Sequence, residues 1–161
     1  MQKITPFLWF DTEGEDAARY YTSVFPNSRI VEIQRYGEAG PRPDGTVMTV
    51  AFELDGQRFV ALNGGPQYIF NEAISLAVEC EDQDEVDRYW DTLTDGGEPG
   101  PCGWLKDRFG VSWQIVPRRL TELVADEDRE KAQRVMAAML RMGKIDIAEL
   151  ERAAAGEEVR A

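Results

Sequence analysis

The residue types that could carry out chemistry gather in one segment, from Cys102 to Gln114. The Cys102 thiol is a potential nucleophile, and Lys106 or Arg108 could lower its pKa by favouring the thiolate. A catalytic cysteine normally needs a neighbouring base, usually histidine, and this sequence contains no histidine. A buried, inert thiol is therefore the favoured interpretation of Cys102, and we predict no catalytic residue.

A second set of candidates consists of side chains and loops that could line a pocket. The segment from Asn63 to Pro66 could bind an anion through its backbone N–H groups. It lacks the lysine and hydroxyl residue of a phosphate loop, so an ordinary loop is the default interpretation. Aromatic residues are numerous for a small domain, and those outside the core favour a flat or apolar ligand. These aromatic candidates are Phe7, Trp9, Phe70, Trp104 and Trp113.

Composition limits the classes of partner. The 161 residues carry 18 basic and 30 acidic side chains, and the net charge of −12 disfavours nucleic acid and anionic membranes. No apolar run approaches the roughly 18–20 residues of a membrane-spanning helix, and the N-terminus does not resemble a signal peptide. Two cysteines form no disulfide framework, so we expect a cytoplasmic protein with reduced thiols.

The elements that position these residues follow one order twice. The first half predicts strands over residues 4–10, 29–36, 46–54 and 57–62, with a helix over 11–25 and an Asp55-Gly56 hairpin turn. The second half predicts a strand over 73–80, a capped helix over 82–95, and extended segments over 98–106 and 111–117. Asp16–Tyr21 and Glu85–Trp90 also match in residue type at a constant offset, which indicates an internal duplication.

After Pro117 the pattern becomes helical. Apolar residues recur at helical spacing at Ala132, Val135, Met136, Met139 and Leu140, and a shorter helix is predicted over 145–154. This apolar stripe could pack on its own domain, cover a partner subunit or bind a membrane. Acidic neighbours disfavour the membrane. Because the duplicated fold leaves limited room, we expect part of the tail to lie across a second subunit.

Several segments together resemble the vicinal oxygen chelate superfamily, which includes glyoxalase I, ring-cleaving dioxygenases and bleomycin resistance proteins. The sequence is most similar to its PhnB-like branch, also called 3-demethylubiquinone 3-methyltransferase-like. The segments that carry the resemblance are Pro6–Asp11, Tyr21–Ser28, Leu62–Pro66, Ile74–Leu76, Cys80–Gln83, Cys102–Gln114 and Ala137–Ile147.

The resemblance implies an α+β fold of two paired βαβββ modules, whose curled mixed sheets surround a cavity, and commonly a homodimer. We expect a duplicated domain over residues 1–118, with modules of about 1–66 and 67–118, and a helical tail over 119–161. The methyltransferase label receives little weight, because no Gly-rich turn follows the first strand and the chain is too rich in strands for a doubly wound sheet.

The enzymes that this sequence resembles hold a divalent metal through histidine and glutamate side chains on strands of both modules. Counting from the turn glycines and the repeat offset places Ile4, Val60, Ala73 and Gln114 at the corresponding positions. Three of these are apolar and Gln114 is neutral. We therefore predict no metal and no cofactor. Gln114 is either a buried amide bonded to backbone or a polar contact in the pocket.

The favoured hypothesis is a metal-free protein that binds an unknown small molecule. The expected ligand-binding residues are Trp9, Asn63, Phe70, Cys102, Trp104 and Gln114. One alternative is an enzyme of the same superfamily, of lyase, dioxygenase or transferase type, with an unconventional site. Another is a dimeric scaffold with a vestigial cavity. We expect a homodimer and neither nucleic acid nor membrane as partner.

Overall fold

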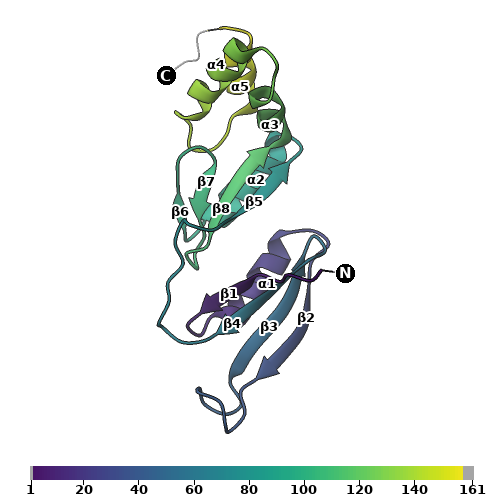
Figure 1. The fold of residues 1–161 in the computed structure, drawn as a ribbon, viewed down its shortest axis with the longest axis vertical. Coiled ribbons are helices and arrows are strands. Elements are labelled where there is room, and N and C mark those ends of the chain that lie inside the picture. The colour runs from purple at the N-terminus through teal and green to yellow at the C-terminus, as the bar shows by residue number, and fades with distance from the viewer. Residues whose placement is uncertain (1, 158–161) are drawn as a thin grey trace. The chain divides into compact units, whose positions relative to one another are not determined.

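The computed structural model describes residues 2–157 and divides into two compact units, which meet in sequence between Phe70 and Asn71. Each unit contains one β-α-β-β-β module, and three helices follow the second module (Figure 1). The fold class is therefore the predicted α+β class with paired modules. Among the described residues, no helix is long and apolar enough to span a membrane.

The first unit is a four-stranded mixed sheet covered on one face by a helix. Its elements are β1 (Phe7–Phe10), α1 (Gly14–Val24), β2 (Arg29–Arg35), β3 (Val47–Leu54) and β4 (Gln57–Asn63), and the strand order is β1-β4-β3-β2. Asp55 and Gly56 both adopt positive φ, as the predicted two-residue hairpin requires. Tyr21 of α1 stacks on Phe52, which stacks in turn on Phe59, so aromatic packing joins the helix to the sheet.

The helix α1 does not begin at the predicted capping residues Asp11 and Thr12. It begins at Gly14, and Glu13 at the N-cap makes no side-chain capping bond. The side chain of Asn63, at the end of β4, accepts the Gly14 N–H at 2.8 Å instead. A residue that is distant in sequence therefore caps this helix, which local sequence rules cannot foresee.

The second unit repeats the same connectivity. Its elements are β5 (Ser75–Cys80), α2 (Gln83–Thr94), β6 (Glu98–Pro99), β7 (Trp104–Lys106) and β8 (Ser112–Pro117), with strand order β5-β8-β7-β6. Asp82 caps α2 by accepting the Glu85 N–H at 2.9 Å, as predicted. The extended segment expected over 98–106 is interrupted, because residues 100–103 form a turn between β6 and β7.

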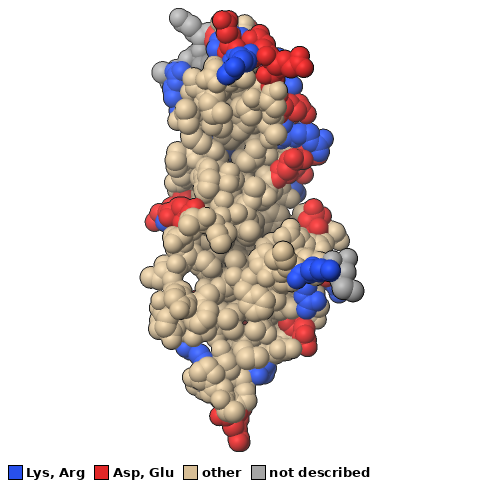
Figure 2. Space-filling model, in the orientation of Figure 1, with Lys and Arg blue, Asp and Glu red and all other residues tan. Residues whose placement is uncertain are grey.

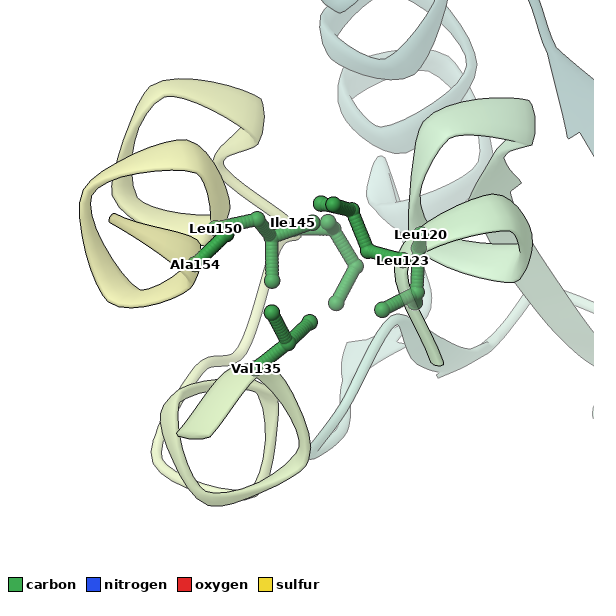
Figure 3. Packing of buried hydrophobic residues seen from close by; sticks show 6 residues of the cluster. All are labelled: Leu120, Leu123, Val135, Ile145, Leu150 and Ala154. Carbon is green, nitrogen blue, oxygen red and sulfur yellow. The ribbon is translucent and has the colours of Figure 1, made fainter. Parts of the chain in front are cut away.

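Three helices complete the second unit: α3 (Arg118–Val124), α4 (Arg129–Met139) and α5 (Ile147–Ala154). They share a core of buried apolar side chains, in which residues of all three helices and of the α4–α5 connection point toward one another (Figure 3). The core residues are Leu120, Leu123, Val135, Ile145, Leu150 and Ala154.

This packing corrects the expectation that the tail lacks room on its own chain. The sequence pattern did not predict α3, which supplies Leu120 and Leu123 as partners for the apolar stripe of α4. Val135 in that stripe is completely buried, whereas Leu140 at the end of α4 remains 62% exposed. Most of the apolar stripe of α4 is therefore covered by residues of the same chain.

The connection between α4 and α5 is bonded to the sheet part of the second unit. The Cys102 and Gly103 N–H groups donate to the carbonyl oxygens of Met142 and Gly143, both at 2.8 Å. The Gln83 side chain donates to the Ile145 carbonyl oxygen at 3.0 Å and accepts the Ile147 N–H at 2.8 Å. These four bonds tie the helical tail to α2 and to the turn before β7.

Candidate functional site

A cavity of about 440 Å³ lies beside β6 and β7 in the second unit. The segment from Pro99 to Pro101 contributes to its wall. Its polar and aromatic lining consists of Glu72, Glu98, Cys102, Trp104, Lys106 and Ser112. Figure 2 shows acidic side chains gathered at the β6 edge, next to a largely uncharged surface over β7 and β8. Proteins bind small organic molecules in cavities of this size.

The turn between β6 and β7 has a specific backbone geometry. Cys102 and Gly103 both adopt positive φ, of 58° and 84°. A Cβ atom on Gly103 would lie 2.9 Å from the Ile115 carbonyl oxygen, so glycine is required for both conformation and space. Gly100 donates to the Trp104 carbonyl oxygen at 2.8 Å, which closes the turn. The non-glycine residue Cys102 is therefore held in a left-handed conformation on the cavity wall.

The strand register decides which side chains share the face of the sheet at the cavity. Trp104 pairs with Gln114, and Lys106 pairs with Ser112. Because alternate strand residues point to opposite faces, these four lie on one face. The intervening residues Leu105, Trp113 and Ile115 are buried on the other face, where α2 contacts β7 and β8.

Ser112 is the unusual residue of this face. It is only 1% exposed, and its Oγ has no hydrogen-bond partner among the residues that the structure describes. Buried polar groups are nearly always hydrogen-bonded, and leaving one unpaired costs about 1–3 kcal/mol. Ser112 lines the cavity, so a bound ligand could supply the missing partner.

The charged side chains of the cavity are unevenly paired. Lys106 forms a salt bridge with Glu72, and the hydrogen bond between them raises the pKa of Lys106 and lowers the pKa of Glu72. Glu98 lies opposite Lys106 in the strand register, but no salt bridge involving it is found within residues 2–157. The cavity therefore carries one carboxylate in excess.

The two thiols have different surroundings. Cys80 is buried at the end of β5, and desolvation raises its pKa to about 12, so it is unreactive at neutral pH. Cys102 is partly buried and lines the cavity. Of the two thiols, only that of Cys102 can therefore be reached by a ligand or reagent in the cavity.

Asp107, which sequence reasoning did not single out, organises the turn that precedes β8. Its buried carboxylate accepts the Phe109 N–H at 2.8 Å, the Val111 N–H at 3.1 Å and the Trp113 indole N–H at 2.8 Å. These bonds fix the start of β8, and with it the position of Ser112. An acid three residues before a turn glycine, Gly110, was the available signal.

The structure places the six expected ligand-binding residues in two different units. Cys102 and Trp104 line the cavity, and Gln114 lies on the same sheet face, where its amide donates to Ser75 Oγ at 2.8 Å. Trp9, Asn63 and Phe70 lie in the first unit. Glu98 and Ser112 were missed, because only the pairing of β6, β7 and β8 reveals which residues share this face. Glu72 was missed because it lies in the loop before β5 and reaches the cavity through its salt bridge with Lys106.

In the first unit, the three expected residues have internal partners. Asn63 caps α1 and donates to the Val47 carbonyl oxygen at 3.2 Å, and Phe70 packs edge-on against Phe10. The Trp9 indole N–H donates to the Gly65 carbonyl oxygen at 2.9 Å. A Cβ atom on Gly64 would overlap the Trp9 ring, so this loop is shaped around an aromatic side chain.

The strand positions that correspond to a metal site do not fit a divalent cation. Register pairs Val60 with Phe7 and Gln114 with Ala77, whereas Ile4 and Ala73 precede β1 and β5. None of the four paired side chains is an imidazole or a carboxylate. Within residues 2–157, no group of three or more His, Cys, Asp or Glu residues could hold a metal ion.

Comparison with known proteins gives one family match. The model of the family described as 3-demethylubiquinone-9 3-methyltransferase matches residues 2–116. A putative member of that description from Bacillus cereus, a PhnB protein, is 39% identical; the alignment covers 72% of this chain and 99% of that chain, with a TM-score of 0.65. No curated protein matches.

Two further solved structures share the fold. Protein PA1353 from Pseudomonas aeruginosa is 20% identical, with 73% of this chain and 98% of that chain covered and a TM-score of 0.60. The fosfomycin resistance protein FosX from Mesorhizobium loti is 17% identical, with 78% and 100% covered and a TM-score of 0.55. At these identities the likeness concerns the fold alone.

Proposed function

Because the chain belongs to the 3-demethylubiquinone-9 3-methyltransferase family, a PhnB-like branch of the vicinal oxygen chelate superfamily, we propose that it binds a small organic molecule in the cavity beside β7. The proposed site is that of a binding protein without a catalytic metal. Trp104 supplies an aromatic surface, and Ser112 supplies a polar contact.

The buried hydroxyl of Ser112 is the observation that carries this proposal. A hydroxyl that is neither solvated nor bonded destabilises the free protein, and a ligand atom that bonds to it removes this cost. Its place on the wall of a cavity of about 440 Å³ connects this unsatisfied group to a space of suitable size for a ligand.

A panel of small aromatic compounds tests the proposal by thermal denaturation, since a ligand raises the melting temperature once its concentration exceeds its dissociation constant. Dissociation constants of the active compounds are then measured for the wild type, Trp104→Ala and Leu140→Ala. Leu140 is an exposed apolar residue at the end of α4, outside the cavity wall, and serves as the control. We expect Trp104→Ala to weaken binding by about tenfold or more and Leu140→Ala to leave it unchanged. The proposal would be falsified if both substitutions changed the dissociation constant equally, or if no compound raised the melting temperature.

The metal-free character has a separate support. The chain has no histidine, and the four paired strand positions hold Phe7, Val60, Ala77 and Gln114. Tag-free protein should therefore purify without stoichiometric Zn, Ni, Fe or Mn. Elemental analysis that finds about one metal ion per chain contradicts this proposal.

An enzyme with an unconventional site is the second candidate, and the conformation of Cys102 favours it. Strained residues concentrate at functional sites, and Cys102 lines the cavity with a φ of 58°. The fold gives no support to methyl transfer, which the family's description names, because two mixed sheets differ from the doubly wound parallel sheet that binds nucleotide cofactors. Turnover that is lost in Cys102→Ser but retained in Cys80→Ser would favour the enzyme.

We also propose a homodimer in the cytoplasm. Support for the dimer comes from the first unit, where Ile4, Phe7, Tyr68 and Ile69 are each at least 60% exposed. Covering a large apolar side chain contributes roughly 1.5–3 kcal/mol, so a second copy of the chain would gain by covering these four. Support for the location comes from Cys80 and Cys102, which are both free thiols.

A further inference from the structure

The strand register produces a row of polar residues across the face of the sheet at the cavity. Glu98 of β6 pairs with Lys106 of β7, Lys106 pairs with Ser112 of β8, and Ser112 pairs with Ser75 of β5. All four therefore project from the same face. Neighbouring strands are about 4.8 Å apart, so the backbones of Glu98 and Ser112, which are two strands apart, are separated by roughly 10 Å. This spacing corresponds to the length of a bicyclic aromatic molecule with a short side chain.

The charge along this row favours a cation. Lys106 is the only basic residue on the described cavity wall, and Glu72 already forms a salt bridge with it. Glu98 faces Lys106 and contributes to raising its pKa, but it forms no salt bridge within the described part of the chain. Two carboxylates therefore share one ammonium group on this wall, which favours a cationic ligand over an anionic one. The net charge of −12 acts in the same direction over longer distances.

The apolar part of the cavity favours an aromatic ring. Trp104 is partly buried between the turn and β8, and Pro99 and Pro101 add apolar surface without side-chain hydrogen-bonding groups. Tryptophan is the aromatic residue that attracts cations most strongly, and its ring also stacks on other rings. A ligand that combines a ring with a protonated amine would therefore match both parts of the wall.

We propose that the ligand of this cavity is a planar aromatic amine, an inference that rests on the proposed small-molecule function. Its ammonium group binds Glu98, its ring contacts Trp104, and a polar ring atom bonds to the Ser112 hydroxyl, which has no other partner in the described chain. The unpaired and 1% exposed Ser112 is the independent sign of a ligand, and Glu98 determines the ligand's charge.

Three indoles with the same ring and different charges test the ligand class: tryptamine is a cation, indole-3-ethanol is neutral and indole-3-acetate is an anion. Binding to the full-length protein is measured by isothermal titration at low ionic strength. We expect tryptamine to bind about tenfold or more tightly than the other two, which corresponds to one charge-pair contact.

Two variants connect the preference to the site. Glu98→Gln should reduce tryptamine affinity to that of indole-3-ethanol, and Ser112→Ala should reduce it severalfold. Glu32→Gln, which changes an exposed carboxylate on β2 of the first unit, is the control and should have no effect. Circular dichroism verifies that each variant folds, which we expect because Glu98 and Glu32 are exposed and Ser112→Ala removes only an unpaired hydroxyl.

The remaining outcomes separate this inference from the proposed function. If the three indoles bind equally, or if Glu98→Gln keeps the preference for tryptamine, the amine class is wrong while small-molecule binding stands. If no indole binds but compounds of the aromatic panel bind in a Trp104-dependent way, the amine class is again wrong. If neither set binds, both proposals fall.

Discussion

The backbone N–H of Gly103 donates to the carbonyl oxygen of Gly143 at 2.8 Å. Gly103 belongs to the turn beside the cavity and lies within residues 2–116, which the family model matches, whereas Gly143 lies outside that match. The adjacent bond from Cys102 to Met142 repeats the arrangement. The α4–α5 connection, which lies beyond the family match, therefore holds the cavity turn of this chain.

Removing the unpaired hydroxyl should stabilise the protein. Ser112→Ala eliminates a buried group without a partner, so we expect the free energy of unfolding to rise by about 1 kcal/mol or more. Ser75→Ala is the matched control, because it removes the acceptor of the Gln114 amide and should lower the same quantity by about 1 kcal/mol. Urea denaturation measures both. A loss of stability in Ser112→Ala would mean that its hydroxyl has a partner in solution.

Two glycines separate the cost of backbone conformation from the cost of a steric clash. Gly45 and Gly103 have similar positive φ values, of 81° and 84°, but a Cβ atom on Gly45 would meet no atom within 4 Å. Gly45→Ala should therefore cost only the conformational energy of about 1–2 kcal/mol. Gly103→Ala should cost clearly more, because its Cβ would collide with the Ile115 carbonyl oxygen. Chemical denaturation of both variants checks this, and equal losses contradict the close approach.

Thiol alkylation should distinguish the two cysteines. With its pKa raised to about 12 by burial, Cys80 holds only about one part in ten thousand as thiolate at pH 8. Cys102 is partly buried on the cavity wall and should react first with iodoacetamide. Peptide mass spectrometry identifies the modified residue, and urea-unfolded protein, in which both thiols should react, is the control. Faster modification of Cys80 in the folded protein would refute its burial.

The oligomeric state should depend on the first unit rather than on the tail. We expect light scattering after size exclusion to give a dimer for the full chain. Phe7→Glu and Ile69→Glu should shift it toward monomer by placing charges among exposed apolar side chains. Leu140→Glu, at the exposed end of α4, is the control and should remain dimeric. A monomeric wild type refutes the dimer.

Local signals in the sequence predicted most of the elements but not the site. Period-two patterns, the Asp55-Gly56 turn and the Asp82 cap have local causes, and the structure contains all three. The helix α3 was missed because its seven residues give only two turns of pattern.

The cavity depends on which strands pair and in which register. Glu98, Lys106 and Ser112 come together only through that pairing, and sequence spacing does not encode it. Asn63 shows the same limit, because its side chain caps a helix that begins 49 positions earlier in the chain, and no local pattern indicates that role.

The attachment of the cavity turn to the α4–α5 connection has a thermodynamic consequence. A turn that donates hydrogen bonds to a distant segment loses them whenever that segment opens, so local unfolding of the α4–α5 connection and disorder of the cavity wall are linked. Such linkage is reciprocal. A ligand that binds only the ordered turn should slow amide hydrogen exchange in α4 and α5. A molecule that binds these helices should change the affinity of the cavity for its ligand, and the ligand should change the affinity of the helices for that molecule by the same factor.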